Sequence, residues 1–213
     1  IYTLSLHDAL PIYAYRVLRV TNPSPYMVFM KIGENEIIST SPETLVRYQN
    51  GRMTTFPIAG SRPRGKTEEE DIALEKDLLQ DEKELSEHNM LVDLGRNDIG
   101  KISKFNSVTV TEYMKVLRYS KIMHICSEVQ SDALDTVDSF DAIEAVLPAG
   151  TLSGAPKVRA CEIIEELEKC PRGIYGGAIG YIDFNGNMDT CIAIRMASKI
   201  KDKVYVQAGG GIV

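Results

Sequence analysis

The sequence predicts an α+β fold in which antiparallel β-sheets, arranged like a sandwich, carry helices on the outside. Three observations support this prediction. Short β-rich runs fill the first quarter of the chain and return in its last third, with turn-forming residues between them. Helical periodicity dominates the stretch from residue 66 to residue 98. Strands therefore precede and follow the helices, without the regular β-α-β alternation of a parallel fold.

The N-terminal β-rich runs are expected to pair as hairpins. They span Tyr15 to Val20, Tyr26 to Lys31, Glu36 to Thr40 and Met53 to Ile58. Aromatic and β-branched side chains suit the pleated, half-buried surface of a sheet, and the Gly, Asn and Pro residues between the runs suit turns.

Helices are predicted in the middle of the chain. Residues 66 to 98 are rich in Glu, Lys and Leu and predict one or two amphipathic helices. Phe140 to Leu147 predicts a short helix ended by Pro148, and another helix should start near Pro156 and end before Pro171. That last helix is expected to bury one stripe, because its apolar residues follow the spacing i, i+3, i+4, i+7: Ala160, Ile163, Ile164 and Leu167.

Further strands are expected after the first helical region. These runs span residues 107–111, 124–129, 176–182, 191–197 and 204–208. The Asn185-Gly186 pair is a strong signal of a hairpin between two of them.

Composition excludes some classes of partner. The 213-residue chain is 44% hydrophobic and has a formal net charge of -6, so it can bury a large core but offers no basic stripe to nucleic acid or to an anionic membrane. No apolar run reaches the roughly 18 residues of a transmembrane helix. The four widely spaced cysteines include no C-x-x-C pair and are expected to be reduced core thiols of a cytoplasmic protein.

Both ends of the sequence are expected to be cut. Residues 1 to 12 resemble translated sequencing adaptor and are expected to be a non-native leader. The chain stops at Val213 inside an apolar run that no turn residue closes. Residues 13 to 213 are therefore expected to form one domain that is incomplete at both ends.

Two carboxylates form the first candidate site. Glu84 and Glu87 are three residues apart in a predicted helix, so both project from one face. Mg²⁺ binds one or two carboxylates and completes its shell with water and substrate oxygens, so it suits this pair. A solvated acidic face explains the same spacing, and the adjacent His88 is expected at the surface.

Other candidate residues each have two explanations. The segment from Pro148 to Lys157 combines glycines, hydroxyls and a helix N-terminus, which fits an anion site or an ordinary helix cap. Arg195, in an apolar strand run, should pair with an acid or with a ligand carboxylate. His124 fits a core or a catalytic role, and the glycines at 209 to 211 fit a flexible turn or a ligand approaching the backbone.

Long motifs identify a family. From about Tyr13 to Val213 the chain contains, in this order, SPETLVR, PIAGSRPRG, DEKELSEHNMLVDLGRND, MHICSEV, PAGTLSGAPKVRACEII, YGGAIGY, NMDTCIAIR and VQAGGGIV. Together they resemble the enzymes that use chorismate, and among these the large subunits of anthranilate synthases. Two residues depart from the usual pattern, Ser61 in place of Thr and Gly210 in place of Ala.

The resemblance implies a Mg²⁺-dependent catalytic domain that adds ammonia to chorismate and then eliminates pyruvate, giving anthranilate for tryptophan biosynthesis. It implies that Glu87 binds the metal, with Glu84 beside it. It assigns Glu43 as the general acid for the departing hydroxyl, His124 to the elimination of pyruvate, and Thr151 to fixing the substrate.

The resemblance also implies donors for the substrate carboxylates. These are the backbone at Gly60 and Ser61, the side chains of Tyr175 and Arg195, and the run Gly209, Gly210 and Gly211. Glycine there lets the backbone approach a ligand closely.

The implied partners are a glutamine amidotransferase subunit that delivers the ammonia, and tryptophan as a feedback inhibitor bound at Pro25, Tyr26 and Met27. Ala59 favours anthranilate synthase over aminodeoxychorismate synthase, which typically has lysine there. Isochorismate and salicylate synthases use a lysine in a segment that would precede Tyr13. A non-catalytic tryptophan sensor is the alternative from another class, but it would have no need of the acid, metal and elimination residues together.

Overall fold

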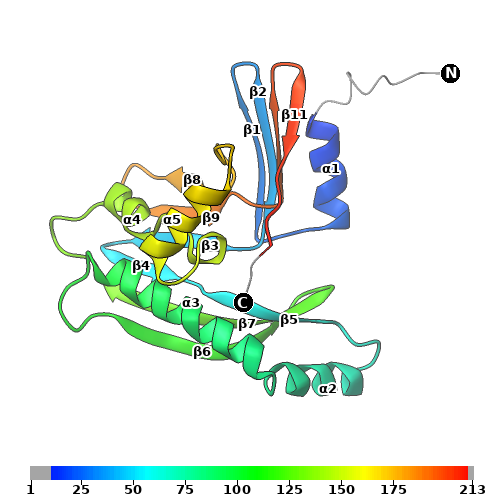
Figure 1. Cartoon of the computed structure of the whole chain (residues 1–213), viewed down its shortest axis with the longest axis vertical. Coiled ribbons are helices and arrows are strands. Elements are labelled where there is room, and N and C mark those ends of the chain that lie inside the picture. The colour runs from blue at the N-terminus through cyan, green and yellow to red at the C-terminus, as the bar shows by residue number, and fades with distance from the viewer. Residues whose placement is uncertain (1–10, 211–213) are drawn as a thin grey trace.

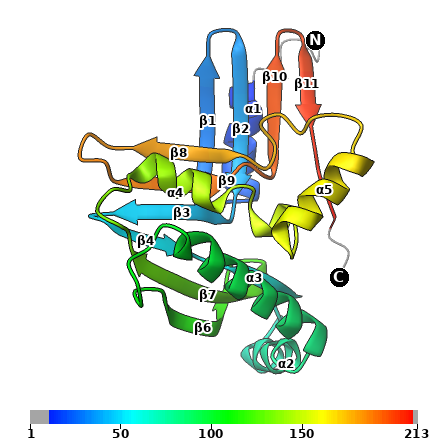
Figure 2. The same ribbon diagram turned by 60° about the vertical axis from the view of Figure 1, so that its left-hand side comes forward.

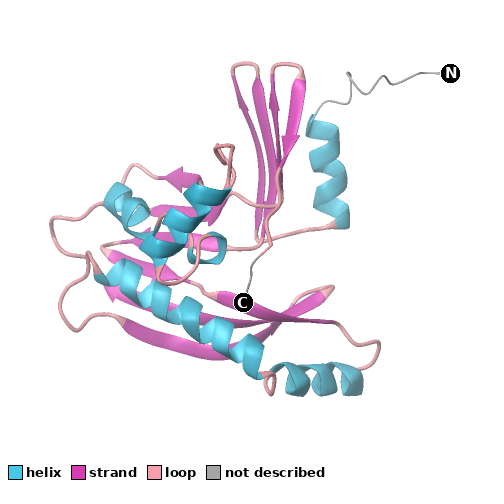
Figure 3. Cartoon of the chain, viewed as in Figure 1, coloured by secondary structure: helices cyan, strands magenta, loops and turns pink. Residues whose placement is uncertain are grey.

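Two antiparallel β-sheets form the framework of residues 11–210, the part of the chain that the computed structural model describes (Figure 1). Helices lie around the sheets, so the α+β class is confirmed (Figure 3). The helices are α1 (Pro11–Thr21), α2 (Glu68–Leu78), α3 (Glu82–Gly100), α4 (Ser139–Val146) and α5 (Lys157–Leu167), with a 3₁₀ turn η1 (Gly150–Leu152). The strands are β1 (Tyr26–Ile32), β2 (Asn35–Ser41), β3 (Thr44–Gln49), β4 (Arg52–Thr55), β5 (Ile58–Pro63), β6 (Thr109–Arg118), β7 (Ile122–Asp132), β8 (Ala178–Ile182), β9 (Met188–Ile192), β10 (Met196–Ile200) and β11 (Lys203–Val206).

The smaller sheet has the strand order β1-β2-β10-β11, and α1 lies along it (Figure 2). The larger sheet has the order β5-β7-β4-β3-β9-β8, and β6 also pairs with β7. The hairpin predicted at Asn185-Gly186 joins β8 to β9, where Ile182 pairs with Met188. Every pairing is antiparallel, as the sequence predicts.

The chain crosses from one sheet to the other at two adjacent places. The first crossing, residues 42–43, joins β2 to β3, and the second, residues 193–195, joins β9 to β10. The amide of Ile192 donates to the carbonyl of Glu43 at 3.0 Å, and the amide of Thr40 donates to the carbonyl of Arg195 at 3.1 Å. These bonds hold the two crossings side by side, which sets Glu43 close to Arg195.

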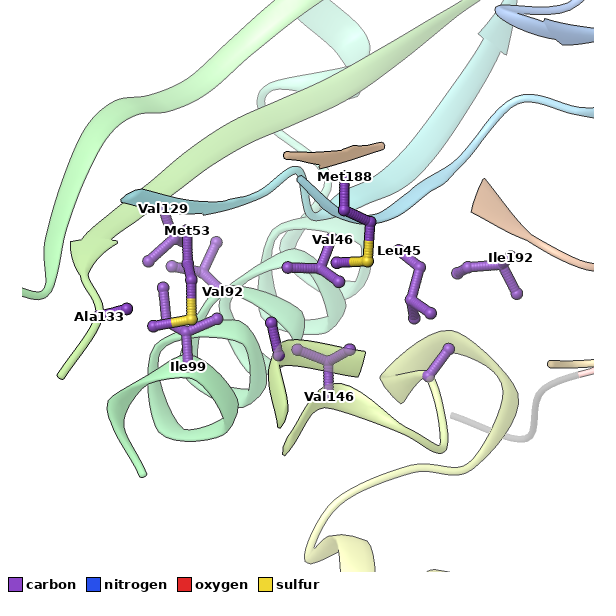
Figure 4. Packing of buried hydrophobic residues seen from close by; sticks show 12 residues of the cluster. Leu45, Val46, Met53, Val92, Ile99, Val129, Ala133, Val146, Met188 and Ile192 are labelled. Carbon is purple, nitrogen blue, oxygen red and sulfur yellow. The ribbon is translucent and has the colours of Figure 1, made fainter. Parts of the chain in front are cut away.

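The largest core cluster fills the space between the larger sheet and helices α3 and α4 (Figure 4). Met53, Ile99 and Val129 are completely buried there. Burying side chains of this size stabilises a fold by roughly 1.5–3 kcal/mol each. This packing fixes α3 against the sheet and therefore fixes the direction of the polar side chains that α3 carries.

The strand predicted at residues 15 to 20 is wrong, because these residues belong to helix α1. Tyr15 and Leu18 are half-buried while their neighbours are exposed, and the Tyr15 ring lies 6.0 Å from the Phe29 ring of β1. A three-residue spacing of the buried residues is helical, and the β-forming composition concealed it. The leader expected at residues 1 to 12 lies mostly outside the described residues.

Two further expectations about regular structure are wrong. Residues 191 to 197 do not form one strand, because the second crossing separates β9 from β10. Helix α5 has the expected bounds but buries none of its residues, and Leu167 is 73% exposed. Within the stripe Ala160 and Ile164 are half-buried, whereas Ile163 and Leu167 stay exposed. No helix of this part of the chain is long and apolar enough to cross a membrane.

The four cysteines are free, as expected. Cys126 and Cys191 are buried and Cys161 is half-buried. The expectation of a core position is wrong for Cys170, which is exposed in the loop after α5.

His88 is fully buried, so its expected surface position is wrong. Its Nε2 lies 2.6 Å from the hydroxyl of Ser127, and that hydroxyl accepts the amide hydrogen of Met114 at 2.9 Å. The hydroxyl can therefore donate to an unprotonated His88 and join α3 to β7. Burial lowers the pKa of His88 to about 4.

We expect the His88→Gln variant to lose part of the acid sensitivity of folding. The unfolded chain protonates His88 below pH about 6.5, but the folded chain does so only near pH 4, so stability falls as the pH drops through this window. The full effect is about 3 kcal/mol. Urea unfolding of the wild type and the variant at pH 7, 5.5 and 4 measures it. Equal pH dependence of the two proteins would contradict a neutral buried His88.

Candidate active site

A cavity of about 610 Å³ lies beside the two crossings. This volume is typical of pockets that bind small molecules. Its wall comes from the loop after α1, the first crossing, β5, α3, the β6–β7 hairpin and the second crossing. The lining residues predicted from the sequence are Pro25, Glu43, Gly60, Ser61, Glu84, Glu87, His124 and Arg195.

Glu43 is the acidic group of the first crossing. Burial raises the pKa of Glu43 to about 7, although a hydrogen bond from the Thr151 side chain and the positive charge of Arg195 both lower it. At neutral pH a large fraction of this carboxyl group therefore keeps its proton. Such a group can donate a proton to a leaving group at physiological pH.

A β-bulge places Ser61 beside His124. Ala59 pairs with Ile125 and Ser61 pairs with His124, so Gly60 is the additional residue. In a regular ladder Ser61 would instead face Met123, on the buried side of β7. With the bulge, the Ser61 hydroxyl lies 2.8 Å from Nδ1 of His124.

Gly60 is the residue that permits this bulge. Its φ is +77°, and a Cβ there would lie 3.1 Å from Ile125 Cδ1 and 3.2 Å from Glu84 Oε2. Any larger side chain would be strained at this φ and would press on the carboxylate of Glu84.

His124 lines the cavity, and its Nδ1 lies 2.8 Å from the Ser61 hydroxyl and 3.3 Å from the carbonyl oxygen of Gly60. In the tautomer with the proton on Nδ1, both oxygens can accept from it, and Nε2 is the nitrogen that can take up a proton. Burial lowers the pKa of His124, the Gly60 contact raises it and Arg195 lowers it. The ring is therefore neutral at physiological pH.

Glu84 and Glu87 face the cavity from the first turns of α3. Asp81 caps this helix by accepting hydrogen bonds from the amides of Lys83 and Glu84, which fixes the helix start. Glu84 lies 3.9 Å from Arg62, so its charge is partly neutralised, whereas Glu87 forms no ion pair with any residue between 11 and 210. Two half-buried carboxylates on one cavity wall fit a Mg²⁺ site, because this ion needs only one or two protein carboxylates. A cluster of three or more metal-ligating side chains does not occur within residues 11–210.

Arg195 supplies a cation at the second crossing. Its φ is +47°, an uncommon conformation for a residue with a side chain, so its expected place within a strand is wrong. Arg195 lines the cavity together with Lys121. These positive groups oppose three carboxyl groups across a small volume, so the cavity suits an anionic ligand held near a metal ion.

Sequence reasoning missed part of the wall. Tyr119, Ser120 and Lys121 form the tip of the β6–β7 hairpin and line the cavity. The Tyr119 ring meets His124 edge to face at 5.8 Å between centroids. The pairing of Leu117 with His124 could have revealed this position, but the strand ends were not predictable closely enough.

Several predicted residues lie away from the cavity. The Tyr26 hydroxyl is 2.8 Å from the Thr44 hydroxyl and donates to Asp189 at 2.7 Å, so it joins the two sheets. The Met27 carbonyl accepts from Tyr15 of α1 at 3.5 Å. Tyr175 lies near Gly209, whose added Cβ would be 3.4 Å from the Tyr175 hydroxyl. Gly210 adjoins Gly209 outside the cavity wall, and Gly211 lies outside the described residues.

Tyr175 is nevertheless tied to the second crossing. The amide of Gly176 donates to the carbonyl of Ala193 at 2.9 Å, and the amide of Ala193 donates to Gly177 at 2.8 Å. These bonds place the Tyr175 turn two residues from Arg195. Thr151 is exposed and lines a small hollow together with Glu43, and its side chain forms the hydrogen bond that lowers the pKa of Glu43.

The fold brings a carboxyl group, an imidazole and two cationic side chains to one cavity of the size that small molecules occupy. The chain belongs to the family of chorismate binding enzymes, whose family model matches residues 2–213.

Known relatives agree with this assignment. The chain is 60% identical over 203 residues to anthranilate synthase component 1 of Acetivibrio thermocellus, covering 95% of this chain and 41% of that protein. The component 1 of Pseudomonas aeruginosa is 57% identical, with coverage of 96% and 42%. The crystal structure of anthranilate synthase component I from Streptococcus pneumoniae TIGR4 matches with a TM-score of 0.88 and 53% identity, over 96% of this chain and 45% of that one. The chain thus spans about two fifths of the length of these curated relatives.

Proposed function

We propose that the protein carrying this chain is the large subunit of an anthranilate synthase, which converts chorismate and ammonia into anthranilate and pyruvate. One observation carries the proposal: a carboxyl group with a pKa of about 7, Glu43, lines the same cavity as the neutral base His124. The names of the similar proteins from Acetivibrio, Pseudomonas and Streptococcus support the same reaction.

Chorismate carries two carboxylates, and the cavity offers matching donors. Arg195 and Lys121 supply positive charge, and the backbone at Gly60 and Ser61 comes to the cavity surface. Tyr175 and the glycines at 209 to 211 stay proposed donors through the resemblance alone: Tyr175, Gly209 and Gly210 lie outside the cavity lining, and Gly211 lies outside the described residues. We therefore place the substrate ring between β5 and the second crossing.

The reaction needs an acid and then a base. Glu43 protonates the C4 hydroxyl as it leaves while ammonia adds at C2, so water departs and Glu43 becomes a carboxylate. His124 then accepts the C2 proton through Nε2 while the C3–O bond breaks, so the ring becomes aromatic. The enolpyruvyl group leaves as enolpyruvate, which takes up a proton at its methylene carbon and becomes pyruvate. Both residues hold the required protonation state at neutral pH.

Glu87 and Glu84 would hold a Mg²⁺ ion in this proposal. When bound, the ion supplies positive charge that orients the ring carboxylate of the substrate and stabilises the charge that develops during the reaction. The oxygen-only donors and the open cavity beside them suit that ion.

Ala59 separates the proposal from related reactions. Ala59 lines the cavity, and its methyl group cannot form the covalent bond to substrate that a lysine in this position can form. We propose that ammonia comes from a glutamine amidotransferase subunit and that tryptophan inhibits through Pro25, Tyr26 and Met27. Support for an effector role is the position of Tyr26, which bonds Thr44, the residue next to Glu43. The cytoplasmic location stays a prediction.

Product analysis tests the proposal directly. We expect the full-length protein to release anthranilate from chorismate, Mg²⁺ and ammonia, and to use glutamine only with an amidotransferase subunit. Chromatography with fluorescence detection identifies the product. If 4-amino-4-deoxychorismate, isochorismate or salicylate were the main product, the proposal would be wrong.

The two helix carboxylates should differ in their effect on metal dependence. We expect Glu87→Gln to lower turnover by about 100-fold or more and to raise the Mg²⁺ concentration needed, because an amide is a poorer ligand for a hard cation. Glu84→Gln is the matched control and should have the smaller effect, since Arg62 already neutralises part of its charge. Rate titrations with Mg²⁺ measure both. Wild-type behaviour of Glu87→Gln at low Mg²⁺ would make the pair a solvated helix face.

His124→Met should separate the two chemical steps. Ammonia can still add, but removal of the C2 proton slows by about 10² to 10⁴, so the aminated intermediate should accumulate. Chromatography of the reaction mixture detects it, and a thermal melt of the variant serves as the control. A lowered melting temperature with equal loss of both steps would assign His124 to packing instead.

A further inference from the structure

Lys157 lies outside the cavity but is bound at the base of the segment that carries Thr151. Its Nζ donates to Asp98 Oδ2 at 2.6 Å, to the carbonyl of Pro148 at 2.7 Å and to the carbonyl of Val146 at 2.9 Å. These three bonds use all three hydrogens of the ammonium group. The side chains of Lys157 and Asp98 are only 14% and 9% exposed.

The bonds of Lys157 close a loop of residues 148–157. Lys157 is the first residue of α5, and Val146 is the last residue of α4. The ammonium group therefore binds the C-terminal end of one helix, the carbonyl at the start of the loop and a carboxylate of α3 at once. Removing the ammonium group would break the bonds that join the two ends of the loop to each other and to α3.

Thr151 lies in the middle of this loop, in η1. An added Cβ at Gly150 would lie 3.0 Å from Leu94 of α3, so the turn packs tightly on that helix. The carbonyl of Leu152 accepts a hydrogen bond from Arg172 at 2.7 Å. The position of the Thr151 hydroxyl is thus set by contacts on both sides and by the closure that Lys157 provides.

We propose that Lys157, fixed by Asp98, is a positioning residue that holds the Thr151 hydroxyl against the Glu43 carboxyl group. The inference rests on the proposed role of Glu43 as the general acid. It adds a buried ion pair, which touches neither the substrate cavity nor Glu43, to the groups that support the general acid.

The chain offers a matched control in Lys101. Its Nζ donates to the other oxygen of Asp98 at 3.1 Å and to the carbonyl of Ala145 at 3.2 Å, and neither acceptor belongs to the 148–157 loop. Lys101 and Lys157 therefore share a carboxylate and the end of α4. In Lys157→Met, Lys101 still neutralises Asp98, which reduces the penalty of leaving a buried charge unpaired.

The pH profile of kcat/KM distinguishes positioning from general stability. The Thr151 hydroxyl lowers the pKa of Glu43, so loss of that bond raises the pKa and keeps Glu43 protonated to higher pH. Arg195 and Cys126 are the other charged or titratable groups that act on Glu43, and His124 shares its cavity. Burial raises the pKa of Cys126 to about 12, so the thiol stays neutral over the range measured.

The experiment compares Lys157→Met, Thr151→Val, the double variant and Lys101→Met in the full-length enzyme. We expect Lys157→Met and Thr151→Val to move the basic limb of the profile upward by about one pH unit and to lower kcat/KM by about 10- to 100-fold. The double variant should match the single ones because both changes remove one interaction. Lys101→Met should keep the wild-type profile.

A lower melting temperature of Lys157→Met without a shifted limb would overturn the proposal, as would equal shifts in Lys101→Met or additive effects in the double variant. Asp98→Asn, which keeps the shape of the side chain, replaces Lys157→Met if the latter does not fold, and it should shift the limb in the same direction. Glu43→Gln tests the underlying role separately. If Glu43→Gln retained wild-type activity and the basic limb of the pH profile, Glu43 would not be the general acid. That result would not depend on the behaviour of the Lys157 variants.

Discussion

The backbone hydrogen bonds between the two crossings set the geometry of the whole site. Ile192 donates to Glu43 and Thr40 donates to Arg195, and the Ser39 hydroxyl adds a third bond to Ile194 at 2.8 Å. A strand that leaves one sheet and enters another must break its ladder, which frees backbone groups that need new partners. Here the backbone groups freed at one crossing form hydrogen bonds with the chain at the other crossing. The consequence is that an acid and a cation, separated by about 150 positions in the chain, open onto one cavity.

Burial acts on the two proposed proton-transfer groups in opposite directions, and both shifts favour catalysis. Removing water disfavours the charged form of each group, so the pKa of Glu43 rises to about 7 and the pKa of His124 falls. At neutral pH an ordinary carboxyl group is ionised, and an ordinary imidazole is partly protonated. The same desolvation thus gives an acid that holds a proton and a base that lacks one. Thr151 and Arg195 limit the shift at Glu43, which keeps its conjugate base accessible.

The sequence predicted the helices other than α1, and most strands, because these follow regular periods. The Asn-Gly pair marked the hairpin between β8 and β9, and Pro148 marked the end of α4. What it could not predict were departures from periodicity. The bulge at Gly60 and the crossing at Arg195 depend on pairing between distant strands, and the half-buried face of α1 depends on β1. The candidate residues came from motif resemblance, and the structure then brings eight of them to one cavity while Tyr26, Met27, Tyr175 and Gly209 lie elsewhere.

The strained backbone at Arg195 fixes where its side chain leaves the chain before any ligand arrives. A left-handed conformation in a residue with a side chain costs about 1 to 3 kcal/mol and persists only where the surroundings impose it. At Arg195 they do: Ala193 and Met196 on either side are buried, and the carbonyl of Arg195 accepts the bond from Thr40. The backbone at Arg195 therefore cannot relax without breaking these contacts, and it fixes the direction in which the exposed side chain leaves the crossing. An anion in the cavity then meets a cation whose point of attachment does not move, so binding orders only the rotations within the side chain.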